Sequence, residues 1–176
     1  MSPAFGASAS DEREVTAQLG RPPRRPWRVL LRCPHGRPRV IASPSRLADG
    51  SPFPTTFWLT CPVYIETVAE VESAGGVCDW ESRLRDDPML ALRARAATGA
   101  YVTMREIESG GADACGGAGI GGVRREGSVK CLHARVAAFL AGIDDPVGEG
   151  VAASLPDACD DERCRELAAL WKELET

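Results

Sequence analysis

Apolar and β-branched positions in the first third of the chain predict a small antiparallel sheet. Residues 27–33 and 39–42 are mostly apolar and flank the turn sequence Cys33-Pro34-His35-Gly36, so we expect them to pair as a hairpin. Residues 55–60 are rich in β-branched and aromatic side chains and predict a third strand. The prolines between residues 44 and 54 predict an irregular loop before that strand.

Helical spacing dominates the remainder of the chain. From residue 63 apolar side chains recur three and four positions apart as far as Gly75, and the same spacing returns between residues 160 and 174. Pro88 fits the first turn of a long helix that reaches about residue 107, with Gly99 as a potential break. Further helices are predicted at 11–19, at 80–84, at 129–141 with Ser128 as N-cap, and from Pro146.

These elements indicate an α+β fold, in which a small antiparallel sheet of about three strands near the N-terminus packs with about five helices. A length of 176 residues fits one domain better than two. We therefore expect a single domain over residues 10–176, closed by a helix at 160–175. Residues 1–9 are small and polar and are expected to form a disordered tail.

The charge balance argues against two classes of partner. With 21 basic and 25 acidic side chains the formal net charge is −4, which gives no general case for nucleic acid or membrane binding.

The N-terminal residues lack a basic region followed by an apolar run, so we expect no secretory signal. No stretch approaches about 18 uninterrupted apolar residues. We expect a cytoplasmic protein whose partner is a small molecule or another protein.

Seven cysteines without a secretory signal point to reduced thiols, and their odd number argues against a full disulfide framework. Cys33 and Cys61 each end a predicted strand directly before proline, in a sharp turn that can hold a sulfur outward. Together with Cys131 and one histidine, His35 or His133, they have the residue types of a zinc site with three cysteines and one histidine. Three thiolates suit an iron–sulfur cluster equally well. Burial as small apolar side chains is the plain alternative.

Cys131 is also a candidate catalytic nucleophile. It lies in the first turn of the helix predicted from residue 129, where free N–H groups, the helix dipole and Lys130 favour a thiolate. His133 would then be its general base. Residues two apart in a regular helix lie about 200° apart around the axis, so only a distorted first turn would let Cys131 and His133 face one metal ion. His35 follows Cys33 in a turn and has no such restriction.

The segment 109–127 contains eight glycines and matches G-x-G-x-x-G at 117–122. A dinucleotide site needs a strand before these glycines and a helix opening at them, and neither context is present. Arg124 and Arg125 at the end of the segment could instead hold an anion over the cysteines, with a flexible linker as the plain alternative. Four carboxylates near Cys61 could serve acid–base chemistry, with a solvated helix face as the default expectation; they are Asp49, Glu66, Glu70 and Glu72.

Several unusual motifs run through the chain: residues 32–38 (Arg-Cys-Pro-His-Gly-Arg-Pro), 44–62 and 128–133 (Ser-Val-Lys-Cys-Leu-His), with shorter ones at 119–122 and 145–148. Together they resemble a bacterial family known as domain of unknown function 501, over about residues 18–150. The resemblance implies that Cys33, Cys61, Cys131 and His133 belong together, and it favours His133 over His35 as the fourth ligand. Ala138 stands where many relatives have a further histidine. The family implies no activity.

Our leading hypothesis from the sequence is therefore a protein that binds zinc, or alternatively an iron–sulfur cluster, through Cys33, Cys61 and Cys131, with His133 as ligand or close neighbour. One alternative is an enzyme with Cys131 as nucleophile and His133 as base. Another is a non-enzymatic interaction module without a metal, in which the cysteines are structural and the apolar closing helix binds a protein partner.

Overall fold

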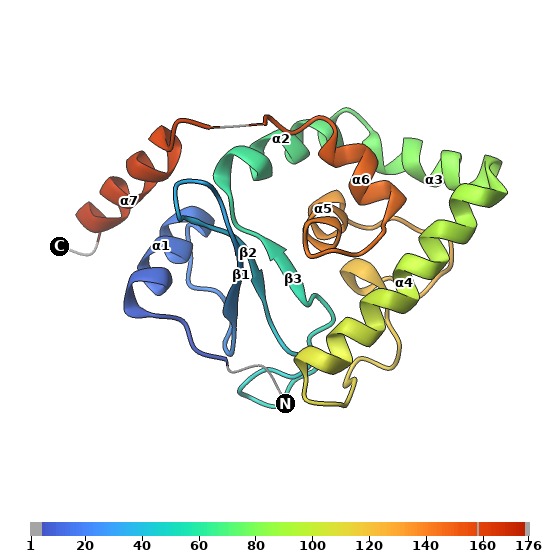
Figure 1. Ribbon diagram of the computed structural model, residues 1–176, viewed down its shortest axis with the longest axis horizontal. Coiled ribbons are helices and arrows are strands. Elements are labelled where there is room, and N and C mark those ends of the chain that lie inside the picture. Colours follow the sequence, from blue (N-terminus) through green and yellow to red (C-terminus); the bar gives the residue numbers. More distant parts are fainter. Residues whose placement is uncertain (1–4, 158, 175–176) are drawn as a thin grey trace.

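A three-stranded antiparallel sheet lies at the centre of the computed structural model, which describes residues 5–157 and 159–174 (Figure 1). The strands are β1 (Arg28–Arg32), β2 (Pro38–Ala42) and β3 (Phe57–Leu59), in the order β1-β2-β3. The predicted hairpin joins β1 to β2 through a turn in which the Cys33 N–H donates to the Arg37 carbonyl over 2.9 Å. Gly36 has a φ of 77° in this turn, which a residue with a side chain rarely adopts.

Seven α-helices and one 3-10 turn complete the described part of the chain. They are α1 (Ala9–Leu19), α2 (Pro62–Ser73), α3 (Gly76–Asp86), α4 (Pro88–Glu108), η1 (Ile120–Gly122), α5 (Leu132–Leu140), α6 (Pro146–Ala152) and α7 (Glu162–Leu174). The α+β class and the N-terminal sheet are confirmed, with more helices than the expected five or so. Residues 1–4 of the predicted tail and residue 175 of the predicted closing helix lie outside the described residues.

Helix α4 continues through Gly99 without the break that the sequence allowed. Pro88 occupies its first turn, and the Asp87 side chain caps it by accepting from the N–H groups of Met89 and Leu90. A glycine costs a helix about 1 kcal/mol relative to alanine, which is too little to divide a helix of 21 residues that is capped and packed. None of the described helices is long and apolar enough to cross a membrane.

The two faces of the sheet bury different layers of the molecule. Val40 and Ala42 of β2 point to the main core with Phe57 of β3, whereas Ile41 points to the opposite face and packs with Val15 of α1. This alternation follows from the two-residue period of a strand. Figure 1 accordingly shows α1 and α7 on one side of the sheet, with α5 against the other side and α4 along the outer edge of the molecule.

Helix α5 begins at Leu132, three residues later than predicted, and Ser128 is not its N-cap. The reason is tertiary: the Val129 N–H donates to Glu81 of α3 over 2.9 Å, and the Leu132 N–H donates to Glu72 of α2 over 2.5 Å. In a helix capped by Ser128, the Leu132 N–H would close the first turn on the Ser128 carbonyl; Glu72 accepts it instead, and Glu81 holds the Val129 N–H. Cys131 becomes the N-cap residue, in an extended conformation with φ −154° and ψ 119°.

The backbones of helices α5 and α6 lie so close together that no side chain fits between them at Gly148. A Cβ on Gly148 would lie 2.3 Å from the Arg135 carbonyl oxygen, so this position accepts only glycine. Arg135 and Asp145 form a buried ion pair over 3.0 Å beside this contact, and Asp145 also caps α6 by accepting from the Gly148 N–H. The start of α5 is therefore held from two sides, by α6 and by the glutamates of α2 and α3.

Candidate metal site

Three side chains with metal-binding atoms meet where α2 ends and α5 begins. Glu72 lies in the last turn of α2, Cys131 is the N-cap residue of α5, and His133 is the second residue of α5. One carboxylate oxygen, the thiol sulfur and one ring nitrogen lie within 4.8 Å of one another. In the part of the chain that the structure describes, no other three cysteine, histidine or acidic side chains converge this closely.

The extended backbone at Cys131 lets its side chain face that of His133. The Cys131 Sγ lies 4.0 Å from the His133 Nδ1, and the same nitrogen lies 3.3 Å from the Glu72 Oε1. The angular separation of about 200° expected for residues two apart holds only when both are helical. Because Cys131 lies outside the helix, the late start of α5 removes this obstacle.

The second nitrogen of His133 fixes the tautomer of the ring. His133 Nε2 lies 3.1 Å from the carbonyl oxygen of Ile65, and a carbonyl oxygen can only accept a hydrogen bond. Nε2 therefore carries the hydrogen, and in the neutral ring Nδ1 presents its lone pair to Cys131 and Glu72. Histidines that bind metals are commonly oriented in this way, with the distal N–H donating to a backbone carbonyl or a carboxylate.

Glu72 is held by the same helix terminus that positions the cysteine. Its Oε1 accepts the Leu132 N–H, one of the donors that the first turn of α5 leaves free. The partial positive charge of a helix N-terminus favours a carboxylate at this place. About 29% of the Glu72 side chain and 24% of the His133 side chain are exposed, so solvent reaches the group.

The surroundings of His133 favour its charged form. Its pKa is raised from the ordinary 6.5 to about 9, chiefly by the hydrogen bond with Cys131. The Ile65 carbonyl and the charge of Glu72 raise it further, and burial opposes the shift. Without a metal, the imidazolium proton on Nδ1 therefore occupies the space between the sulfur and the carboxylate, where a cation is electrostatically favoured.

Cys33 and Cys61, the other predicted ligands, do not belong to this group. They follow β1 and β3, which run parallel to each other on either side of β2, so their backbones are separated by two strand spacings, roughly 10 Å. Cys61 is the N-cap residue of α2, at the opposite end of that helix from Glu72. Burial raises the pKa of the Cys61 thiol, and the charge of Cys159 raises it further.

The remaining predicted site residues lie elsewhere. His35 Nε2 lies 2.7 Å from the carbonyl oxygen of Cys159, a residue of the segment before α7. Arg124 and Arg125 line a pocket between the glycine-rich segment, α3 and α4, where they donate hydrogen bonds to the Cys115 carbonyl and the Ser128 hydroxyl. Ala138 is fully buried in the core. Glu72 could not be singled out from the other carboxylates near Cys61 by sequence reasoning, because its pairing depends on how α2 packs against α5.

The comparisons with known proteins give a family and no activity. The model of a family described as "Protein of unknown function (DUF501)" matches residues 29–153, which include Glu72, Cys131 and His133. No curated protein and no solved structure matches the chain.

Proposed function

The chain belongs to the DUF501 family, whose description assigns no activity, and from the geometry of its own side chains we propose that it binds a zinc ion through Glu72, Cys131 and His133. The observation that carries the proposal is the convergence of an oxygen, a sulfur and a nitrogen from separate side chains within 4.8 Å. These are the three donor types that proteins offer to zinc.

The spacing of the donors supports a single ion. With Zn–S bonds of about 2.3 Å and Zn–N or Zn–O bonds of about 2.0–2.1 Å, ligands around a tetrahedral ion lie roughly 3.4–3.6 Å apart. The distances of 3.3 Å from His133 Nδ1 to Glu72 and 4.0 Å from Nδ1 to the Cys131 sulfur lie on either side of this range. Small side-chain rotations therefore suffice to place all three atoms around one ion.

The donor set favours zinc over an iron–sulfur cluster. A cluster with three protein thiolates needs three sulfurs around one point, and the converging group supplies one. A mixed set of sulfur, nitrogen and oxygen is one that zinc accepts readily. Three protein ligands leave a coordination position for water or a substrate, and partial exposure of His133 and Glu72 gives access to it. Such an open zinc ion supplies Lewis-acid chemistry.

The same geometry favours a second candidate, a cysteine nucleophile. Since its pKa is raised to about 9, His133 is an imidazolium near neutral pH, and its Nδ1 lies 4.0 Å from the Cys131 sulfur. A neighbouring imidazolium, oriented through its other nitrogen by a third group, activates a thiol by stabilising the thiolate. In this alternative the Ile65 carbonyl orients the ring, Cys131 attacks the substrate, and no metal is required.

One experiment separates the two candidates. Chelator-treated protein is titrated with zinc, and alkylation of each cysteine by iodoacetamide is followed by mass spectrometry with and without the ion. We expect one zinc per chain, which slows alkylation of Cys131 but not of the exposed Cys78. Failure to bind zinc, with Cys131 alkylated at least about tenfold faster than Cys78 near neutral pH, would replace the metal proposal with the nucleophile.

Zinc affinity should also rise with pH between 7 and 9. The pKa of His133 is raised to about 9, so zinc must displace a proton from Nδ1 throughout this range. Displacing one proton below that pKa changes the affinity by up to about tenfold per pH unit, or roughly 50-fold between pH 7 and 9. Chelator competition at three pH values measures the slope. An affinity that does not change with pH would exclude Nδ1 as a ligand.

A further inference from the structure

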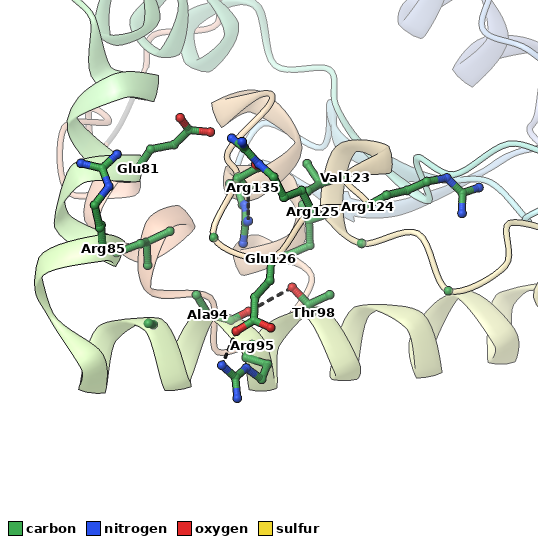
Figure 2. Close-up of a pocket in the computed structure, with 17 residues that line it drawn as sticks. Glu81, Arg85, Ala94, Arg95, Thr98, Val123, Arg124, Arg125, Glu126 and Arg135 are labelled. Carbon is green, nitrogen blue, oxygen red and sulfur yellow. Dashed lines mark hydrogen bonds and ion pairs between the residues drawn. The ribbon is translucent and has the colours of Figure 1, made fainter.

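A pocket lies apart from the proposed zinc ligands, between α3, α4 and the segment 117–128 (Figure 2). Its volume is about 660 Å³, within the range of sites for small organic molecules. Figure 2 shows Glu81 and Arg85 entering from α3, Arg125 and Arg135 facing them, and Ala94 and Thr98 of α4 along the floor.

Five arginines and two glutamates line this pocket, although the chain as a whole carries a net charge of −4. Two of the arginines have their charge balanced: Arg95 pairs with Glu126 of the pocket, and Arg135 pairs with the buried Asp145. The other three, Arg85, Arg124 and Arg125, outnumber the one remaining carboxylate, Glu81, so the lining keeps a surplus of two positive charges.

These three arginines form no ion pair with any described residue. Their hydrogen bonds go to neutral acceptors: Arg85 donates to the Ser82 hydroxyl over 3.4 Å, Arg124 to the Cys115 carbonyl over 3.2 Å, and Arg125 to the Ser128 hydroxyl over 2.7 Å. A guanidinium carries five N–H donors, so each retains donors for a ligand. Unpaired arginines around one concavity attract an anion.

One part of the pocket lining, its apolar wall, is uncharged and closely packed. Leu84, Ala94 and Ile120 contribute uncharged surface to the pocket. The glycine-rich segment fits against α4 so closely that a Cβ on Gly119 would lie 2.9 Å from the Thr98 methyl group. The pocket therefore combines a cationic rim with an apolar wall whose position is set by packing.

We propose that this pocket binds a small organic phosphate, with the phosphate on Arg85 and Arg125 and the organic body against Leu84, Ala94 and Ile120. Planar guanidinium groups match phosphate oxygens through paired hydrogen bonds, which makes arginine the usual phosphate partner. An inorganic anion alone would leave most of a 660 Å³ cavity unfilled. The apolar wall supplies the reason for an organic body.

The pocket and the proposed zinc site share the short η1 turn. Ile120 lines the pocket, while the neighbouring Gly121 faces the thiol side, where a Cβ would lie 3.8 Å from that of Cys131. A bound phosphate ester would therefore lie on the other side of this turn from the sulfur. The phosphate proposal itself does not require zinc, so it is tested on chelator-treated protein.

The test is a titration of the ¹⁵N-labelled full chain with phenyl phosphate, inorganic phosphate and benzoate, followed by amide chemical shifts. We expect phenyl phosphate to shift the signals of residues 117–128 and to bind at least about tenfold more tightly than the other two probes. The variant R85Q/R125Q should weaken its binding at least about tenfold. R13Q, which removes an exposed arginine on α1, should bind as the wild type does.

Four results would overturn the proposal. Equal binding of phenyl phosphate and inorganic phosphate would remove the organic body, and equal binding of benzoate would remove the phosphate. Unchanged affinity in R85Q/R125Q, or shifts spread evenly over the protein, would mean that the arginine pocket is not the site. Since both substituted arginines are exposed, the variant should keep the fold, and its amide spectrum checks this directly.

Discussion

Replacing His133 with alanine should lower the affinity for zinc at least about 100-fold. Loss of a residue that merely orients a ligand typically costs 10–100-fold, and loss of a direct ligand should cost more. His133 supplies the central atom of the group, because its Nδ1 lies 3.3 Å from Glu72 and 4.0 Å from the Cys131 sulfur. Chelator competition with matched protein preparations measures the change. Cys131→Ser should have an effect of similar size, because it replaces the thiolate with a hydroxyl.

The chain offers a matched control for each ligand. His35 is the only other histidine, Cys78 is an exposed cysteine, and Glu70 is an exposed glutamate on the same helix as Glu72. H35A, C78S and E70Q should therefore bind zinc within about threefold of the wild type, while E72Q weakens binding by at least about tenfold. A large loss in H35A or C33S with little change in H133A would instead favour a ligand set around the hairpin turn.

Replacing Arg105 with methionine should lower the free energy of unfolding by about 3–5 kcal/mol, the usual cost of removing one partner from a buried ion pair. Arg105 on α4 is fully buried. Its guanidinium donates to both carboxylate oxygens of Asp113 over 2.9 Å and to the Pro54 carbonyl over 3.1 Å. In R105M the Asp113 charge stays largely buried without its partner. Urea unfolding of the two proteins measures the difference.

Acid conditions provide a second test of this ion pair. Arg105 is the chief reason that the pKa of Asp113 lies well below its ordinary 3.8, helped by the N–H groups of Cys115 and Gly117. A carboxylate with a depressed pKa stabilises the fold above its unfolded pKa and loses that contribution as the pH falls. Wild-type stability should therefore decline below about pH 4 more steeply than that of R105M/D113L, which lacks both charges. The double variant should also be more stable than R105M. If the free energy of unfolding of the two proteins fell in parallel with pH, this would contradict a strong ion pair between Arg105 and Asp113.

The sheet could be predicted from the sequence because its signals are local. The residues 33–36 give the turn, and alternation along β2 places Ile41 on one face with Val40 and Ala42 on the other.

The structure of the glycine-rich segment was harder to predict, since a flexible linker was one of its expected roles. Asp113 instead anchors it, by accepting from Cys115 and Gly117 while it binds Arg105. No local sequence pattern marks Asp113 as the residue that anchors this segment.

The candidate site was predicted only in part, for a physical reason. Cys131 and His133 were identified from their residue types and from the family resemblance. Their convergence could not be predicted, because it depends on Glu72 accepting the Leu132 N–H, which would have closed an earlier first turn of α5, and on Glu81 holding the Val129 N–H. The same contact brings in Glu72, whose expected place was a solvated helix face. Both contacts join residues about 50 or more positions apart, beyond the reach of local periodicity.

X-ray absorption at the zinc edge of the loaded protein tests the proposed site most directly, because it counts the sulfur atoms around the ion. Coordination by Glu72, Cys131 and His133 predicts one sulfur at about 2.3 Å, with nitrogen and oxygen at about 2.0–2.1 Å. Two or more sulfur neighbours would contradict it and would favour a site that includes Cys33 or Cys61.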